Sequence, residues 1–532
     1  MTFEFRTPPF KHQQEAFDRF KDAQYYALLA DRGVGKTKIT IDIAAYKFTL
    51  GQIDIMLVVA PNIVHVQWIE EQLPEHCSVP FRGFAFHLAN KTKKHLVALK
   101  SFLLDQKPQL RILAVAVEAL QYPKTREIIE AFFATSIKMP KVVVDESSRI
   151  KSQKALQTKA IKAVSRAEGR TFNAIITGTP AAKAPVDTYS QYDFIQQGYM
   201  QCTLTAFKHR HAVMKRGKNW KTGQTYEDVI DERTWFDCKQ MLDNNRGQDG
   251  TVPFVALQAV SNKFGVAPRD VDRIDKSDGF SRFKQVDYLL KFIAKDTYSI
   301  LKKDCLDLPE KIHEKVVFQL SPQQNKIIKA LKSDAIATYG SEILTVEHAA
   351  TLRIRILQVC GGHFPFIDAD IGVNSYDTMP IDGPNRKLDF LQKDIPEIGE
   401  QQFLLWAVFV PELDMLYEKL HRDFNVARYN SDHSPEETIR KFKSGEIQGL
   451  IAHPSSVGYG FNFGDASVQY WYSRDDRTEA RIQAEDRSHR ATTTKSPLYI
   501  DLMYDCPTEH KVLANLKEGA ELNDMFMTMK DF

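Results

Sequence analysis

Residues 25–180 alternate short apolar runs with longer amphipathic stretches. The runs are rich in Val, Ile, Leu and Ala, and they lie at residues 25–30, 55–60, 111–117, 141–144 and 173–177. A strand that is covered on both faces reads as a continuous apolar run, and a helix between two such strands joins them in parallel. The block therefore predicts an α/β layer built on a mainly parallel sheet.

A second alternating block begins after residue 400, and its apolar runs lie at residues 403–409, 426–429, 449–453, 468–472 and 498–502. Within it, Ser434 is placed as a helix N-cap, with Pro435 at the first helical position and Glu437 at the third, where a capping box has its acid. We expect two α/β lobes, each a mainly parallel sheet flanked by helices.

Residues 201–300 are less regular, and we expect them to form a helical or irregular insertion on the first lobe. A basic stretch interleaved with aromatic residues includes Lys215, Arg216 and Trp220. Lys and Arg can neutralise phosphates while Trp stacks, so this stretch is a candidate DNA clamp; a solvated charged hairpin is the alternative. We expect the domains to be residues 1–200 (first lobe), 201–300 (insertion with a basic hairpin), 301–385 (connector and start of the second lobe) and 386–532 (second lobe).

The bulk composition fits a globular protein of two to four domains, since a length of 532 residues exceeds what one core usually serves. The net charge of +3 neither indicates nor excludes a nucleic-acid partner, because such footprints depend on local clustering. Six widely spaced cysteines without a Cys-x-x-Cys pair indicate neither a disulfide framework nor a zinc site. The N-terminus lacks a signal core and no run approaches the ~18 apolar residues of a membrane helix, so we expect a cytoplasmic protein.

The first candidate site is the stretch at residues 30–37, which follows an apolar run and opens a helical pattern. Gly33 and Gly35 allow a tight turn whose backbone N–H groups can hold phosphate, while Lys36 reaches the outer phosphate oxygens and Thr37 ligates Mg²⁺. An alanine stands where the general pattern has its first glycine. The alternative is a chance glycine-rich turn.

Two adjacent carboxylates, Asp145 and Glu146, follow the apolar run at residues 142–144. Carboxylates at the end of a buried strand are costly unless a cation or water uses them. Asp145 is therefore placed to hold Mg²⁺ through water, and Glu146 to orient or deprotonate an attacking water. An acidic pair that ends a strand is, on its own, more often a solvated turn.

Two further segments gain meaning only from the first two. The Thr-Gly-Thr-Pro turn at residues 177–180 is either an ordinary strand end or a link between a nucleotide site and a polymer site. A helix over residues 478–490 would place Gln483, Arg487 and Arg490 on one face, where the guanidinium groups could stabilise a transferring phosphoryl group. A solvated helix with salt bridges is the alternative.

Taken in order, these segments resemble the Swi/Snf-related ATPases of helicase superfamily 2, particularly the compact members of bacteria and phages. The resemblance implies two RecA-like lobes that use ATP and Mg²⁺ and track double-stranded DNA largely through its backbone. The implied residues are Gln13, Gly33, Gly35, Lys36, Thr37, Gly458 and Gly460 for ATP; Thr37 and Asp145 for Mg²⁺; Lys36, Asp145, Glu146, Gln483, Arg487 and Arg490 for catalysis; and Asn62, Trp68, Thr179 and Ser455 for nucleic acid, beside the hairpin residues Lys215, Arg216 and Trp220.

The sequence departs from the family pattern at Ser147-Ser148, where many relatives have Gly or Ala followed by His, and at Ala491-Thr492, where Gly-Gln often follows the last arginine. Neither departure removes a catalytic group. We expect a monomeric, DNA-dependent ATPase that translocates on duplex DNA in the cytoplasm of a bacterium or an infected host, serving replication, repair, recombination or remodelling. The alternatives are a strand-separating DNA or RNA helicase and a nucleotide-switched binding module with a slow ATPase.

Overall fold

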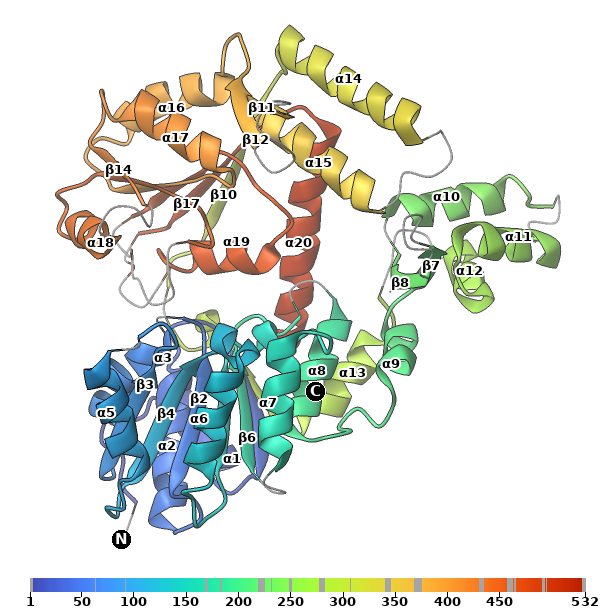
Figure 1. Ribbon diagram of the computed structural model, residues 1–532. Coiled ribbons are helices and arrows are strands. Elements are labelled where there is room, and N and C mark those ends of the chain that lie inside the picture. Colours follow the sequence, from blue (N-terminus) through green and yellow to red (C-terminus); the bar gives the residue numbers. More distant parts are fainter. Residues whose placement is uncertain are drawn as a thin grey trace. The chain divides into compact units, whose positions relative to one another are not determined.

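The computed structural model describes residues 3–528, apart from 63, 91, 168–170, 182–183, 219–224, 231, 248–250, 277–282, 307, 340–345, 368–375, 430–434, 457–462, 464–465, 490–492 and 494. The chain divides into two compact units. The first runs to Cys305 and includes the chain again from Leu522, and the second comprises Leu306–Glu521. Each unit is built on a parallel sheet flanked by helices (Figure 1).

The first unit contains a seven-stranded sheet with the order β3-β4-β2-β5-β6-β1-β9, and all of its neighbouring strands are parallel. In this order β6 lies between β5 and β1, so the carboxyl ends of these three strands lie together at one end of the sheet. The strands are β1 (Tyr25–Ala30), β2 (Ile55–Ala60), β3 (Phe81–Phe86), β4 (Leu110–Ala116), β5 (Lys141–Asp145), β6 (Phe172–Thr177) and β9 (Thr297–Ile300).

Helices cover both faces of this sheet, and alternate residues of each strand enter two separate cores. In β2, Leu57 and Val59 belong to one core and Met56 and Val58 to the other, which explains why the run is apolar throughout. The helices are α1 (Lys11–Phe20), α2 (Lys36–Thr49), α3 (Val64–Gln67), the π-helical turn η1 (Trp68–Gln72), α4 (Leu73–His76), α5 (Lys93–Leu103), α6 (Pro123–Phe133), α7 (Leu156–Ala167) and α8 (Thr188–Ile195), with 3₁₀ turns η2 (Val117–Gln121), η3 (Ser147–Ile150), η4 (Pro185–Asp187) and η5 (Lys302–Asp304).

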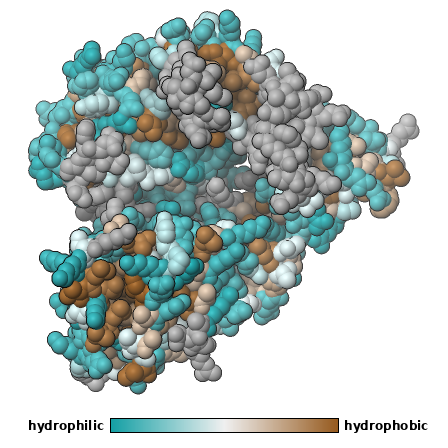
Figure 2. Space-filling model, in the orientation of Figure 1, coloured by the Kyte–Doolittle hydropathy of each residue, from teal (hydrophilic) through white to brown (hydrophobic). Residues whose placement is uncertain are grey.

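The surface of the first unit is apolar around α5. Leu96 and Val97 of α5 are exposed, together with Leu104 directly after it. Figure 2 shows apolar residues gathered on the part of this unit where α5 lies. This area is at the β3 end of the sheet, whereas the phosphate loop follows β1 near the other end.

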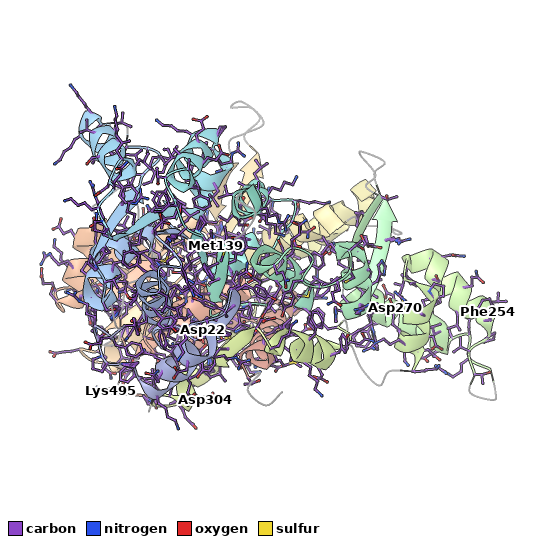
Figure 3. The ribbon with its side chains drawn as sticks, turned by 90° about the horizontal axis from the view of Figure 1, so that it is seen from below. Asp22, Met139, Phe254, Asp270, Asp304 and Lys495 are labelled. Carbon is purple, nitrogen blue, oxygen red and sulfur yellow. The ribbon has the colours of Figure 1, made fainter. Side chains whose placement is uncertain are left out.

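The insertion between α8 and β9 has a separate core in its middle part. Its elements are α9 (Leu204–His211), the antiparallel hairpin β7 (Met214–Lys218) and β8 (Thr225–Val229), α10 (Glu232–Asp243), α11 (Phe254–Phe264), α12 (Pro268–Asp275) and α13 (Val286–Ala294). Trp235 and Val260 belong to that core. A buried ion pair of 2.8 Å joins Asp270 to Lys284. Figure 3 shows Phe254 farther out on the insertion than Asp270.

The second unit contains a six-stranded parallel sheet with the order β10-β17-β16-β13-β15-β14. It too has a core on each face, since Leu405 belongs to one cluster and Leu404 and Trp406 to another. The elements are β10 (Ile312–Phe318), α14 (Pro322–Tyr339), α15 (Val346–Cys360), the antiparallel pair β11 (His363–Ile367) and β12 (Tyr376–Pro380), α16 (Arg386–Glu397), β13 (Phe403–Trp406), α17 (Val410–Leu420), β14 (Val426–Arg428), α18 (Pro435–Lys443), β15 (Gly449–Ala452), β16 (Val468–Trp471), α19 (Thr478–Glu485), β17 (Leu498–Tyr504) and α20 (Pro507–Met527).

The predicted fold class is confirmed: the protein is α/β, with two parallel sheets flanked by helices. The limits of the units differ from the domain limits expected from sequence. Because β9 follows the insertion, the first unit continues to Cys305, and the last turn of α20 returns to it from Leu522. Leu522 and Phe526 belong to one of its two cores.

Candidate active site

The phosphate loop connects β1 to α2, and two glycines give it its shape. Gly33 has a φ of +82° and Gly35 a φ of +86°, a region that side chains other than glycine rarely adopt. Gly35 is the N-cap of α2, so Lys36 and Thr37 open the helix. The first helical N–H groups of α2 are therefore available to an anion, as the sequence predicts.

The start of the loop is fastened to β9. Asp31 donates its backbone N–H to the carbonyl of Ile300 at 3.0 Å, and its Oδ2 accepts the backbone N–H of Lys302 at 2.9 Å. Ile300 and Lys302, which follow the insertion in the chain, thus hold the start of the phosphate loop. The sequence pattern contains no sign of this contact, because the partners are separated by about 270 residues.

The Lys36 ammonium is buried and points back into the loop. Nζ donates to the carbonyl oxygens of Ala30 at 2.6 Å and Asp31 at 3.0 Å. Burial lowers the pKa of Lys36, and the charges of Glu146 and Asp145 oppose that effect. A backbone carbonyl is a weaker partner for an ammonium than a phosphate oxygen, so Lys36 is placed to exchange these contacts for a nucleotide.

Gln13 braces the phosphate loop from α1. Its Nε2 donates to the carbonyl of Val34 at 3.2 Å, while its Oε1 accepts the backbone N–H of Phe10 at 3.0 Å. Nε2 of His12 lies 2.8 Å from the same Val34 carbonyl. The amide of Gln13 is thus next to the phosphate loop, and its part in reading adenine stays a prediction.

Asp145, at the end of β5, is buried and is held from two sides. Its Oδ1 accepts the backbone N–H of Glu146 at 2.9 Å, and its Oδ2 accepts the indole N–H of Trp68 at 2.9 Å. Burial raises the pKa of Asp145 to about 6, with the neighbouring Glu146 charge acting in the same direction. Each oxygen keeps a lone pair for a further ligand.

Glu146 is buried in a strained backbone conformation, with a φ of +50°. Its Oε1 accepts from Arg32 at 3.0 Å, and its Oε2 accepts from the hydroxyl of Thr177 at 3.2 Å. Burial alone would raise the pKa of Glu146, but Arg32, Lys36 and Thr177 together outweigh it and hold that pKa below its usual value. The carboxylate is therefore ionised at neutral pH.

The turn after β6 lies against both the acidic pair and the phosphate loop. The hydroxyl of Thr177 accepts the backbone N–H of Thr179 at 3.0 Å while it donates to Glu146. A Cβ on Gly178 would lie 3.3 Å from the Ala30 carbonyl and 3.8 Å from Lys36 Nζ. The Gly178 carbonyl accepts the side-chain N–H of Asn523, which belongs to the end of α20, at 3.2 Å.

Two residues that are expected to contact nucleic acid have buried side chains. Trp68 is 1% exposed and Thr179 is 2% exposed. Their contact with nucleic acid stays a prediction. Asn62, in contrast, is exposed in the turn after β2, and Ser455 of the second unit is exposed and accepts from Arg477 at 3.2 Å.

The expected helix over residues 478–490 ends early. The helix α19 finishes at Glu485, and the chain then turns, so Arg487 does not share a helical face with Gln483. Gln483 is mostly buried and donates to Glu479 at 3.0 Å. Arg487 is 2% exposed, and its carbonyl accepts the N–H of Phe463 at 2.9 Å. Arg490, Gly458 and Gly460 lie outside the described residues.

A buried charge network that the sequence pattern does not reveal holds α19 on its sheet. Arg481 pairs with Asp501 at 2.7 Å and with Glu485 at 2.5 Å, and its guanidinium lies 3.9 Å from the centre of the Trp471 ring. Arg474 pairs with the same Asp501 at 2.9 Å. The network fixes the helix that precedes Arg487.

The basic hairpin of the insertion is a β-hairpin in the described residues. Lys215 donates to the hydroxyl of Thr234 at 3.3 Å. The side chain of Arg216 is 70% exposed, and its Nε is 2.8 Å from Glu227, so an acid opposes part of its charge. Trp220 lies outside the described residues. The role of the hairpin as a DNA clamp stays a prediction.

Residues 21–360 match the family model of the SNF2-related domain, which is more than half of the chain. The chain belongs to the SNF2-related domain family. The expected family is thus confirmed, and ATP is the nucleotide that this family uses. No helix among the described residues of this SNF2-related protein is long and apolar enough to cross a membrane.

Two curated relatives are similar to this SNF2-related chain. It is 22% identical over 329 residues to “Putative protein p41” of Acyrthosiphon pisum secondary endosymbiont phage 1, a match that spans 61% of this chain and 56% of that protein. It is 21% identical over 407 residues to “Putative ATP-dependent helicase/translocase YwqA” of Bacillus subtilis strain 168, spanning 75% of this chain and 37% of that protein. The matches thus cover less than two thirds of each relative.

Among solved structures, the Sulfolobus solfataricus SWI2/SNF2 ATPase core in complex with dsDNA aligns with 99% of this chain and 95% of its own. The TM-score of that alignment is 0.38, and the sequence identity is 16%.

Proposed function

We propose that this SNF2-related protein is a DNA-dependent ATPase that moves along double-stranded DNA without obligatory strand separation. The observation that carries the proposal is the meeting of Lys36, Asp145, Glu146 and Thr177 at the carboxyl ends of β1, β5 and β6. Family membership makes ATP the nucleotide to test at this place. The relative named as a helicase/translocase supports motor activity rather than a passive nucleotide switch.

The residues present fit ATP and Mg²⁺. Among the described residues, Lys36 donates to backbone carbonyls and forms no ion pair with a carboxylate, so phosphate oxygens can take it without breaking such a pair. Asp145 has a neutral donor on each oxygen and lone pairs to spare, and together with Thr37 it would hold Mg²⁺. The bound cation would neutralise charge on the phosphates.

The chain's own residues supply the acid–base chemistry in this proposal. Glu146 is ionised and its two oxygens are fixed by Arg32 and Thr177, so it can orient an attacking water and accept its proton. Because Thr177 and Gly178 lie in one turn, a shift of that turn would alter both Glu146 and the surroundings of Lys36. Arg487 and Arg490 are proposed to stabilise charge on the transferred phosphoryl group.

Contacts to the phosphate backbone are proposed for the exposed residues Asn62 and Ser455. The hairpin residues Lys215, Arg216 and Trp220 are proposed to form a clamp on the DNA. Duplex DNA is the first ligand to test, because the proposed motor moves along it. Backbone binding predicts weak sequence preference and a steep loss of affinity with salt. A role in replication, repair, recombination or remodelling, in a bacterial or infected cytoplasm and as a monomer, is part of the proposal.

The test is ATP hydrolysis measured in parallel with duplex DNA, single-stranded DNA, RNA and no nucleic acid. We expect the strongest stimulation by duplex; preference for single strands would instead favour a strand-separating helicase, and no stimulation a nucleotide switch. Lys36→Ala should lose nucleotide binding and hydrolysis together, whereas Arg487→Ala should keep binding and lose hydrolysis. Hydrolysis by Lys36→Ala at the wild-type rate would contradict the proposed site.

A further inference from the structure

Trp68 lies at an unusual turn between β2 and β3. It opens the five-residue π-helical turn η1, which interrupts the short helices α3 and α4. A π-helical turn rotates the side chains that follow relative to an α-helix, and such turns are frequent at functional sites. The Trp68 ring belongs to the core cluster that also contains Val58 and Leu73.

The only polar atom of this buried side chain reaches the acid that is expected to hold Mg²⁺. Nε1 of Trp68 donates to Oδ2 of Asp145 at 2.9 Å, and the backbone N–H of Glu146 donates to Oδ1 at 2.9 Å. One donor on each oxygen fixes the plane of the carboxylate. Neither donor carries a charge, so the acid keeps its negative charge for a cation.

We propose that Trp68 is a positioning residue that sets the orientation of the Asp145 carboxylate for the Mg²⁺ form of the nucleotide. This inference rests on the proposed function, because it assigns Asp145 to Mg²⁺. An indole can only donate a hydrogen bond. It therefore holds the carboxylate without competing as a ligand and without pairing away its charge, which a lysine or arginine in the same place would do.

The same side chain ties the nucleotide site to the segment that leaves β2. The backbone N–H of His65 donates to the carbonyl of Pro61 at 3.3 Å, so α3 is hydrogen-bonded to the residue that follows β2. Asn62, the exposed residue proposed to contact nucleic acid, lies six positions before Trp68 in this short segment. A displacement of the segment by a bound polymer would thus move the donor on Asp145.

A buried indole N–H also needs an acceptor for stability alone, and the experiment separates the two roles. Trp68→Phe keeps a buried ring and removes the donor. Trp235→Phe is the matched control, since Trp235 is a buried tryptophan in the separate core of the insertion. The thermal midpoint of both variants is measured beside the wild type.

The first readout is the affinity for a fluorescent ADP analogue, in excess Mg²⁺ and in EDTA. Loss of a group that orients a metal ligand typically costs 10–100-fold in metal affinity. We expect Trp68→Phe to weaken binding about 10–100-fold in Mg²⁺ and to leave binding in EDTA unchanged, with Trp235→Phe near wild type in both. Equal losses in Mg²⁺ and EDTA, or none, would overturn the proposal.

The second readout is the indole ¹⁵N–¹H spectrum, which has few resonances because the chain has five tryptophans. The resonance missing from Trp68→Phe belongs to Trp68, and it should move when ADP is added with Mg²⁺ but not with EDTA. An unmoved resonance would overturn the proposal even if the ATPase is confirmed. A wild type that binds Mg²⁺-nucleotide but ignores DNA would instead sink only the proposed motor function, and one that fails to bind Mg²⁺-nucleotide would sink both.

Discussion

Replacing Gly35 by alanine tests whether Gln13 braces the phosphate loop. The φ of +86° at Gly35 disfavours any side chain, and an added Cβ would lie 2.2 Å from Gln13 Nε2. The amide can move away only by giving up its bonds to the Val34 carbonyl and the Phe10 N–H, at 3.2 and 3.0 Å. The substitution therefore strains the backbone and also dislodges Gln13.

The two effects have separable magnitudes. A left-handed alanine costs about 1–2 kcal/mol, and each lost hydrogen bond costs about 0.5–1.5 kcal/mol. Gly35→Ala should thus lower the free energy of unfolding of the first unit by about 2–5 kcal/mol. Gly33→Ala is the matched control: its φ is +82°, but nothing lies within 4 Å of its added Cβ. It should cost only about 1–2 kcal/mol.

These free-energy costs are measured by equilibrium urea unfolding. The proteins compared are the wild type, Gly33→Ala, Gly35→Ala, Gln13→Ala and the Gly35→Ala/Gln13→Ala double variant. With Gln13 truncated, the clash disappears, so Gly35→Ala should cost only the backbone contribution. The coupling energy between the two sites should be about 1–3 kcal/mol. If Gly35→Ala costs the same with and without Gln13, or no more than Gly33→Ala, the brace does not exist.

Two further predictions concern pH. Arg32→Gln should raise the pKa of Glu146, because the guanidinium opposes the effect of burial on that carboxyl. The acidic limb of the plot of ATPase rate against pH should then move to higher pH. The control Arg32→Lys should leave that limb in place. An unmoved limb in Arg32→Gln would contradict this. Burial alone would raise the pKa of Asp501, but Arg481 and Arg474 outweigh it and lower that pKa to about 2. Its stabilising contribution, about 2 kcal/mol, is full above the unfolded pKa of about 4 and is lost as the pH falls to about 2. Urea unfolding of the second unit between pH 6 and pH 2 should show this loss in the wild type and not in Asp501→Asn. If the free energy of unfolding depends on pH equally in the two proteins, the predicted contribution of Asp501 is wrong.

Strands buried on both faces were visible in the sequence, whereas the two edge strands of the first sheet were not. The residues of β2 and the three valines of β5 form continuous apolar runs because each face meets a core. The edge strand β3 is only partly buried over most of its length and contains Arg82 and Gly83, which blur its pattern. The other edge strand, β9, is short and follows the insertion, so no local signal assigns it to the first sheet.

The site divides in the same way. The phosphate loop and the acidic pair were predicted because their chemistry is local: a turn that needs glycine, and acids that follow a buried strand. The helix before Arg487 was predicted too long, since spacing alone does not reveal that α19 ends at Glu485. The direction in which the Trp68 side chain points could not be predicted from the sequence either, because it depends on one π-helical turn.

By itself the sequence determined that the glycine-bearing turn and the acidic pair directly follow parallel strands, because hydrophobic period and glycine placement are properties of short segments. Only the tertiary structure decided what each charged group touches. It pairs Glu146 with Arg32 and Thr177, gives Asp145 the indole of Trp68, and fastens Asp31 to Lys302. These partners follow strands that are distant in the chain and lie next to each other, or next but one, in the sheet. The order of strands in a sheet is set by the packing of the whole unit.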